Sequence, residues 1–288
     1  MITCISLSAQ LLCGTYDDFD AKVNNVGAFH NAHMDNLKAN FLPPTAITTR
    51  AQAIDYIKDF TRNYYQQHEL EFCPQPLPPI FVNDMFDDTK SFVDKERFVL
   101  GIRTRNTPES LEDCIDRIEE SKVVDNANMQ ILKDVVGMVK SGIDGNETFD
   151  EHRNKLETMA NTWLTANEGK VDNGKDLSGS IIAVGLKSLE WWNSNTDAVS
   201  ILIKADPEYF ENQSGPSMGD NSKSITFVIA QGWLDAAGAL LSGGFSLFNQ
   251  LVDGHVNWNA VGRSTVGGAA FGSAGALSKI AKWLKSLF

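Results

Sequence analysis

Apolar residues recur at steps of three and four along most of this chain, and this spacing is the feature that most constrains its fold. The pattern is strongest between residues 106 and 195, where four consecutive segments each carry one apolar stripe. A period near 3.6 residues is that of an α-helix, and no segment shows the sustained alternation and hairpin turns of paired strands. The sequence therefore predicts an all-α protein, a multi-helix bundle with a C-terminal Gly/Ala-rich helical hairpin.

Capping residues and prolines indicate where these helices begin and end. A first helix is expected over residues 17–41, where Pro43 and Pro44 stop it, and a second over about 50–67. The next begins just after Thr107, with Pro108 in its first turn. The following helices start at Asn126, after the capping residue Thr148, and at Ser178. We therefore expect short loops between helices that pack as neighbours.

The charge of the chain is strongly acidic and unevenly distributed. Acidic residues outnumber basic ones by 37 to 25, giving a net charge of −12, which disfavours a nucleic-acid partner. Residues 226–288 differ, because they hold two acidic and four basic residues, ten of the 22 glycines and no proline. This change of composition indicates a domain boundary, which we place in the polar loop 214–222. The expected layout is a segment 1–15, an acidic helical bundle over 16–215 and a Gly/Ala-rich helical tail over 225–288.

The tail combines apolar length with small residues. The stretch 225–251 is long and apolar, but Asp235 in its middle would cost roughly 2.5–3.5 kcal/mol at the centre of a bilayer, so a routine transmembrane span is not expected. The second stretch, 256–278, is rich in glycine, alanine and serine. Gly268, Gly272 and Gly275 are our candidates for close helix packing, because small residues let two helix backbones approach.

The last residues of the tail, 276–288, form a cationic amphipathic pattern. Drawn as a helix, they place leucines, Ile280 and Phe288 on one side and three lysines on the other, with Trp283 at the boundary. An interfacial membrane helix has this pattern, and so does an ordinary last helix that docks on the bundle. The candidate interface residues are Leu277, Lys279, Ile280, Lys282, Trp283, Leu284, Lys285 and Phe288.

The first residues resemble the end of a secretory signal. Residues 1–9 are apolar and finish on small residues before Gln10, where cleavage is expected. A basic beginning is missing and the apolar run is short. Two interpretations stay open, a signal that is truncated at its start or an ordinary N-terminal segment. We expect a secreted or cell-envelope protein, with a cytoplasmic location as the alternative.

Candidate catalytic and metal-binding residues are few. His30 and His33 share one helical face, but a metal site would need a third ligand from His68 or His152, and no HExxH motif is present. The interpretation without a metal places His30 in a hydrogen bond between helices and His33 in solvent. Cys114 lies on an apolar stripe and is expected in the core. Trp191 and Trp192 suit either a core position, which we favour, or a carbohydrate platform. We predict no catalytic residue and no cofactor.

Two stretches of the chain resemble a known group of proteins. Residues 16–18 lead into 26–35, with the sequence VGAFHNAHMD, and residues 188–192, SLEWW, precede the Gly/Ala-rich tail. Both resemble uncharacterised secreted or envelope-associated bacterial proteins of the Bacteroidetes type, whose mature region begins with a helix carrying Val-Gly-x-x-His-Asn. The resemblance implies an exported location and the domain layout given above, and it implies no activity.

The function we expect is therefore non-enzymatic. The favoured interpretation is an exported bacterial protein whose C-terminal helices associate with a membrane surface or a protein partner. Three alternatives stay open: a structural or interaction protein whose tail is ordinary core, a bacteriocin-like or toxin-like effector, and a metal-dependent enzyme that uses His30 and His33.

Overall fold

The protein is built from α-helices. The computed structural model describes residues 15–40, 50–72, 111–143, 148–170 and 174–195 and, with short gaps, 235–269. Of these residues 88% are helical and none is in a strand, which confirms the predicted all-α bundle. The helices are α1 (Thr15–Lys22), α2 (Val26–Asn40), α3 (Arg50–Phe72), α5 (Leu111–Ser121), α6 (Asn126–Ile143), α7 (Phe149–Asn167) and α8 (Lys175–Ser194).

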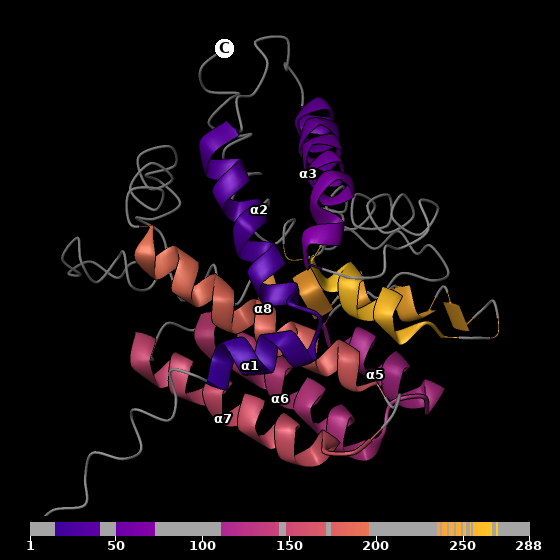
Figure 1. Ribbon diagram of the computed structural model, residues 1–288. Helices are drawn as coiled ribbons and strands as arrows, with labels where there is room; N and C mark the ends of the chain where they lie inside the picture. Colours follow the sequence, from indigo (N-terminus) through magenta and orange to yellow (C-terminus); the bar gives the residue numbers. More distant parts are fainter. Residues whose placement is uncertain are drawn as a thin grey trace, which may run out of the picture.

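Helix α8 lies at the centre of the bundle. Fourteen of its 20 residues are buried, which is far more than one stripe and means that all its sides are covered. It packs against α2 and α7 above all, and also against α6 and α1. In Figure 1, α2 and α3 stand above a layer that contains α1, α5, α6, α7 and α8. The predicted stripe through Ile182, Leu186, Leu189 and Trp192 is thus one part of a surface that is buried all round.

The helices between residues 111 and 167 match their sequence patterns. Helix α6 starts at Asn126, as predicted, and α7 is preceded by Thr148. Thr148 and Glu151 form a capping box, in which each side chain binds the other residue's backbone N–H. The predicted stripe residues Ile115, Ile118, Leu132, Val135, Leu156 and Trp163 are all buried. Local capping chemistry and apolar spacing therefore agree here, so the prediction is confirmed.

The single helix predicted over 17–41 is wrong, because the structure has two helices there. Asn24 and Asn25 adopt positive φ angles of 61° and 54°, which end α1 and turn the chain. Asparagine tolerates this left-handed conformation better than most residues. Asp20 then accepts hydrogen bonds from the backbone N–H groups of Gly27 and Ala28, both at 2.8 Å, and so caps α2. The break lets α1 and α2 each lie against α8.

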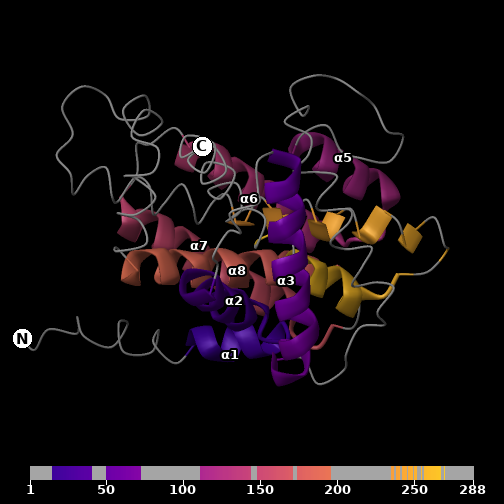
Figure 2. The same ribbon diagram turned by 90° about the horizontal axis from the view of Figure 1, so that it is seen from above.

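The described part of the tail forms a helical hairpin, as predicted. The described residues from 235 to 251 are helical, the chain turns at Gly254 with φ 85°, and residues 258–266 are helical again. The Ser264 hydroxyl donates to the Ser242 carbonyl at 3.3 Å and thereby joins the two limbs. We call residues 235–269 the C-terminal hairpin. Figures 1 and 2 show it, in orange to yellow, next to α3.

Glycines let the hairpin and α2 approach their neighbours closely. A Cβ atom at Gly244 would lie 2.5 Å from the Cys114 sulfur of α5. A Cβ atom at Gly27 would lie 2.7 Å from the Ala183 carbonyl oxygen of α8, and backbone atoms cannot easily move away. Gly27 therefore sets the distance between α2 and α8.

We expect Gly27→Ala to lower the free energy of unfolding by about 1–3 kcal/mol, because the added methyl group collides with the α8 backbone. The matched control is Gly137→Ala in α6, where nothing lies within 4 Å of the added atom. That variant should gain about 1 kcal/mol from the higher helix propensity of alanine. Urea unfolding of both variants measures the difference. Equal changes in the two would contradict a close contact at Gly27.

Candidate functional site

The residues proposed from the sequence as the interface lie outside the described residues. These are Leu277, Lys279, Ile280, Lys282, Trp283, Leu284, Lys285 and Phe288, together with Gly268, Gly272 and Gly275. The boundary loop 214–222 also lies outside them. The structure does describe the segment that precedes this interface, and it shows how the C-terminal hairpin is held in the bundle.

Asp235, the first described residue of the hairpin, has a carboxylate that is completely buried. Two side chains of α8 donate to its Oδ2 atom, the Ser188 hydroxyl at 2.5 Å and the Trp192 indole N–H at 3.2 Å. The His30 Nε2 atom of α2 lies 3.6 Å from the same oxygen. A buried carboxylate without such partners would cost several kcal/mol. These contacts explain how an acidic residue is accommodated in the apolar stretch.

The Asp235 cluster has the residue types of a hydrolase triad but not its geometry. In a triad the serine hydroxyl donates to the histidine, and the histidine is oriented by the acid. Here Ser188 donates to the acid itself, and His30 faces the same acid. Asp235, His30 and Ser188 are all fully buried, so no substrate reaches them. The cluster is therefore a structural clamp rather than a catalytic centre.

Arg263 brings a second buried charge from the other limb of the hairpin. Its Nη1 atom donates to Glu69 Oε1 of α3 at 2.8 Å, and both side chains are almost fully buried. The Tyr65 hydroxyl also donates to this oxygen, at 3.4 Å. Removing one partner of a buried ion pair costs far more than the net contribution of the pair, because a charge is left uncompensated. The pair therefore fixes the second limb against α3.

His30 and His33 lie where α2 meets its neighbours. His30 is buried, but its Nδ1 atom lies 3.1 Å from the side-chain oxygen of Asn31 on the same helix, so the described contacts do not include the predicted hydrogen bond between helices. The prediction that His33 faces solvent is wrong, because only 2% of it is exposed. Helix α3 covers it with Tyr64 and Phe60, whose ring centroids lie 5.0 and 6.4 Å from the imidazole. Burial, and to a lesser extent the charge of His30, lowers the pKa of His33 to about 3.

A metal site at these histidines finds no support in the described residues, which contain no group of three suitable ligands. His68, one of the two candidates for a third ligand, is partly exposed and its Nδ1 atom lies 2.8 Å from Glu71 Oε1. His152, the other candidate, is buried on α7. Two imidazoles alone are too few for the usual zinc site.

The remaining sequence candidates are core residues. Cys114 is fully buried, and burial raises the pKa of its thiol to about 12, with a further contribution from the charge of Asp113. A thiol this hard to ionise is a poor nucleophile. Trp191 and Trp192 are buried too, and the Trp191 indole N–H donates to Asp35 at 2.7 Å. They join α8 to α2 and to the hairpin, so the carbohydrate platform is not supported.

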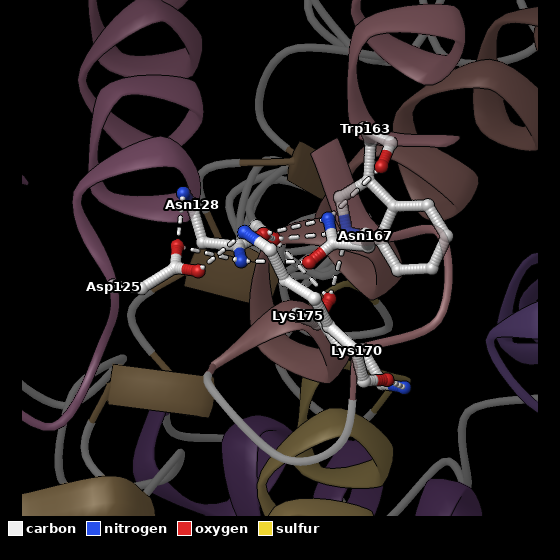
Figure 3. A network of polar contacts seen from close by, with 7 residues as sticks. Asp125, Asn128, Trp163, Asn167, Lys170 and Lys175 are labelled. Carbon is white, nitrogen blue, oxygen red and sulfur yellow. Dashed lines mark hydrogen bonds and ion pairs between the residues drawn. The ribbon is translucent and has the colours of Figure 1, made fainter. Parts of the chain in front are cut away.

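A second polar network joins the ends of α6, α7 and α8 (Figure 3). The Asn128 and Asn167 amides donate to each other at 2.9 and 3.1 Å, and Ser178 donates to Asn128 at 2.7 Å. Asp125 accepts from the backbone N–H of Asn128 at 2.8 Å, and the Trp163 indole donates to the Lys175 carbonyl at 2.9 Å. The members satisfy one another, so the network connects helix ends and has no group aimed at a ligand.

Two residues that hold the hairpin in the bundle were not predicted from the sequence. Glu69 and Arg263 lie 194 positions apart, and neither shows a local pattern that separates it from an exposed charge. One signal was present, since Arg263 is the single basic residue of the tail before Lys279 and lies among small and apolar residues. A lone charge in such surroundings indicates a buried partner elsewhere in the chain.

None of the described helices is both long and apolar enough to span a membrane. Comparison of the chain with family models, with curated proteins and with solved structures finds no match.

We expect Glu69→Gln to lower the free energy of unfolding by about 3–5 kcal/mol, because Arg263 would keep a buried, unmatched charge. Glu119→Gln is the matched control, since Glu119 pairs with Lys133 at 2.6 Å on the surface, and it should cost less than about 1 kcal/mol. Chemical unfolding compares the two variants. The buried pair would lose its assigned role if both changes cost the same.

The stability of the protein should fall on acidification through His33. Its pKa in the folded state, about 3, lies below that of an exposed histidine, about 6.5, so the unfolded chain binds the proton more tightly between these values. The free energy of unfolding therefore falls as the pH is lowered from about 6.5 toward 3, by up to about 1.4 kcal/mol per pH unit. Between pH 7.5 and 5.0, the free energy of unfolding of His33→Phe should fall by about 2 kcal/mol less than that of the wild type. Urea unfolding at both pH values measures the difference. A slope that this variant leaves unchanged would assign the pH dependence to other groups.

Proposed function

We propose that this chain is a non-enzymatic, exported protein that binds an anionic membrane surface through its cationic C-terminal segment, residues 276–288. The observation that carries the proposal is the pattern of this segment, which places three lysines opposite a row of leucines, Ile280 and Phe288. Such segments bind at the interface through buried apolar area and attraction to anionic lipids. Each lysine near the surface contributes about 1 kcal/mol.

The burial of the C-terminal hairpin supports this assignment to the last residues of the chain. Asp235 and Arg263 are buried in the bundle with partners on α2, α3 and α8, so the hairpin is engaged in the core. The apolar and cationic residues that follow it are then tethered to a folded carrier. The carrier is strongly acidic, and an anionic surface repels it while attracting the lysine-rich end. The molecule would therefore bind through one end only.

A second candidate function follows from the same burial. If residues 276–288 dock on the bundle as a last helix, the chain is a structural or interaction protein whose tail is ordinary core. The packing of residues 235–269 against α3, α5 and α8 favours this candidate for the part of the tail that is described. The two candidates differ in whether the lysines of the last segment meet lipid.

The test is flotation of the full chain with vesicles of neutral lipid or of neutral lipid with about one third anionic lipid, at pH 7.5. We expect binding to the anionic vesicles that weakens in high salt. Replacing Lys279, Lys282 and Lys285 by glutamate should reduce the partition coefficient at least tenfold. The matched control replaces the lysines Lys22, Lys122 and Lys170 of the bundle by glutamate, which changes the net charge equally.

If the control loses binding as completely as the C-terminal variant, net charge rather than the segment governs association. If the full chain floats with neither vesicle at pH 7.5, the membrane function fails and the interaction-protein candidate replaces it.

A further inference from the structure

The contact between α2 and α3, which we call the joint, contains the imidazole ring of His33. No described group would accept a hydrogen bond from a second proton on this ring. His33 of α2 is buried, and neither of its ring nitrogens has a hydrogen-bond partner among the residues that the structure describes. It lies in a cluster of aromatic rings formed by α3, whose Tyr64 is 5.0 Å from it between ring centroids. Burial keeps it neutral, with a pKa of about 3. A proton added here would be a buried charge without an acceptor.

Near this joint, the acidic groups whose side chains the structure describes have partners other than His33. On α2, Asp35 accepts from the Trp191 indole of α8. On α3, Glu71 pairs with His68 at 2.8 Å and Glu69 with Arg263. On α8, Glu190 lies 3.5 Å from Lys187. On the hairpin, Asp235 is bound by Ser188 and Trp192 and lies 3.6 Å from His30. Among the described residues His33 therefore forms no ion pair, whereas Asp235 lies 3.6 Å from its neighbour His30.

The same joint links the two buried sites that hold the hairpin, which are the Asp235 cluster and the Glu69–Arg263 pair. Asp235, on the first limb, is bound by Ser188 and Trp192 of α8 and lies 3.6 Å from His30 of α2, whereas Arg263, on the second limb, is held by Glu69 of α3. The first limb is thus tied to α8, against which α2 packs, and the second to α3, and the aromatic contacts of His33 and Phe29 with α3 hold α3 against α2. If α3 separates from α2, the Asp235 cluster and the Glu69–Arg263 pair can no longer both stay intact. At least one buried charge then loses its partner or meets water.

We propose that His33 is an acid-sensitive latch, whose protonation separates α3 from α2 and releases the C-terminal hairpin from the bundle. The release is a property of the bundle alone. Its consequence rests on the function proposed above, because a released hairpin would add its apolar surface to the membrane contact of residues 276–288. Acidification would in this way convert surface attachment into a deeper association.

The size of the effect follows from proton linkage. In the open form His33 is exposed and its pKa takes the ordinary value of about 6.5, whereas in the closed form it is about 3. Between pH 7.5 and 5.0 this difference raises the equilibrium constant for opening about 30-fold. Carboxylates with ordinary pKa values of about 4 remain mostly ionised at pH 5.0.

The experiment is hydrogen exchange of the full chain without lipid at pH 7.5 and 5.0, with rates corrected for the intrinsic effect of pH. In the wild type we expect the protection of amides in residues 235–269 to fall about 30-fold and to stay below that of the slowest amides of α6 and α7 at both pH values, because the hairpin opens without global unfolding. In His33→Phe, which fills the aromatic site without titrating, the fall in the hairpin should be less than threefold. His68→Gln is the matched control on α3 and should behave as the wild type does. His33→Leu replaces the phenylalanine variant if that variant does not fold.

Three results would overturn the latch. They are an unchanged protection of the hairpin in the wild type, the same fall in the His33 variant, and hairpin amides as protected as the slowest amides of α6 and α7, which would indicate that the hairpin opens only by global unfolding. Flotation at both pH values separates the latch from the proposed function. Release without flotation at either pH leaves the latch and removes the membrane function. Flotation without release leaves the membrane function and removes the latch.

Discussion

Helix α8 is buried on all sides, and the arrangement of the other helices follows from the need to enclose it. Helices α2 and α7 cover two of its sides, and the small residues Gly27 on α2 and Gly179 on α8 permit the close approach. The C-terminal hairpin completes the cover, since Asp235 is bound by the α8 side chains Ser188 and Trp192. This deeply buried helix thus organises segments that lie far apart in the sequence.

Buried charges give this enclosure its specificity. Asp235 and Arg263 each have one buried position where their charge is matched, one facing His30 and α8 and the other facing Glu69 of α3. A shift of the hairpin by one turn would leave both unmatched. We therefore interpret the two pairs as the features that set its register.

The proposed membrane binding and the proposed acid response assign different roles to two parts of the molecule that differ in charge. In these proposals the acidic bundle encloses the core, whereas the cationic end would attract an anionic surface. The hairpin lies between them in the sequence and carries both buried charges. Because Asp235 and Arg263 are held by α8 and α3, the proposed latch at the contact of α2 with α3 would govern how much of the tail is available in acid.

Local chemistry in the sequence determined the helices, while tertiary packing decided what their polar residues do. The stripes between residues 111 and 192, the helix start at Asn126 and the cap at Thr148 depend on neighbours three or four positions away, so their prediction was correct. The break between α1 and α2 at Asn24 and Asn25 was not predicted, because asparagine is compatible with both a helix and a turn. The burial of His33 depends on α3, and the pairing of Glu69 with Arg263 on contact across 194 positions. Periodicity records which side of a helix is apolar, but only the assembled bundle decides which polar group is taken out of water and what stands opposite it.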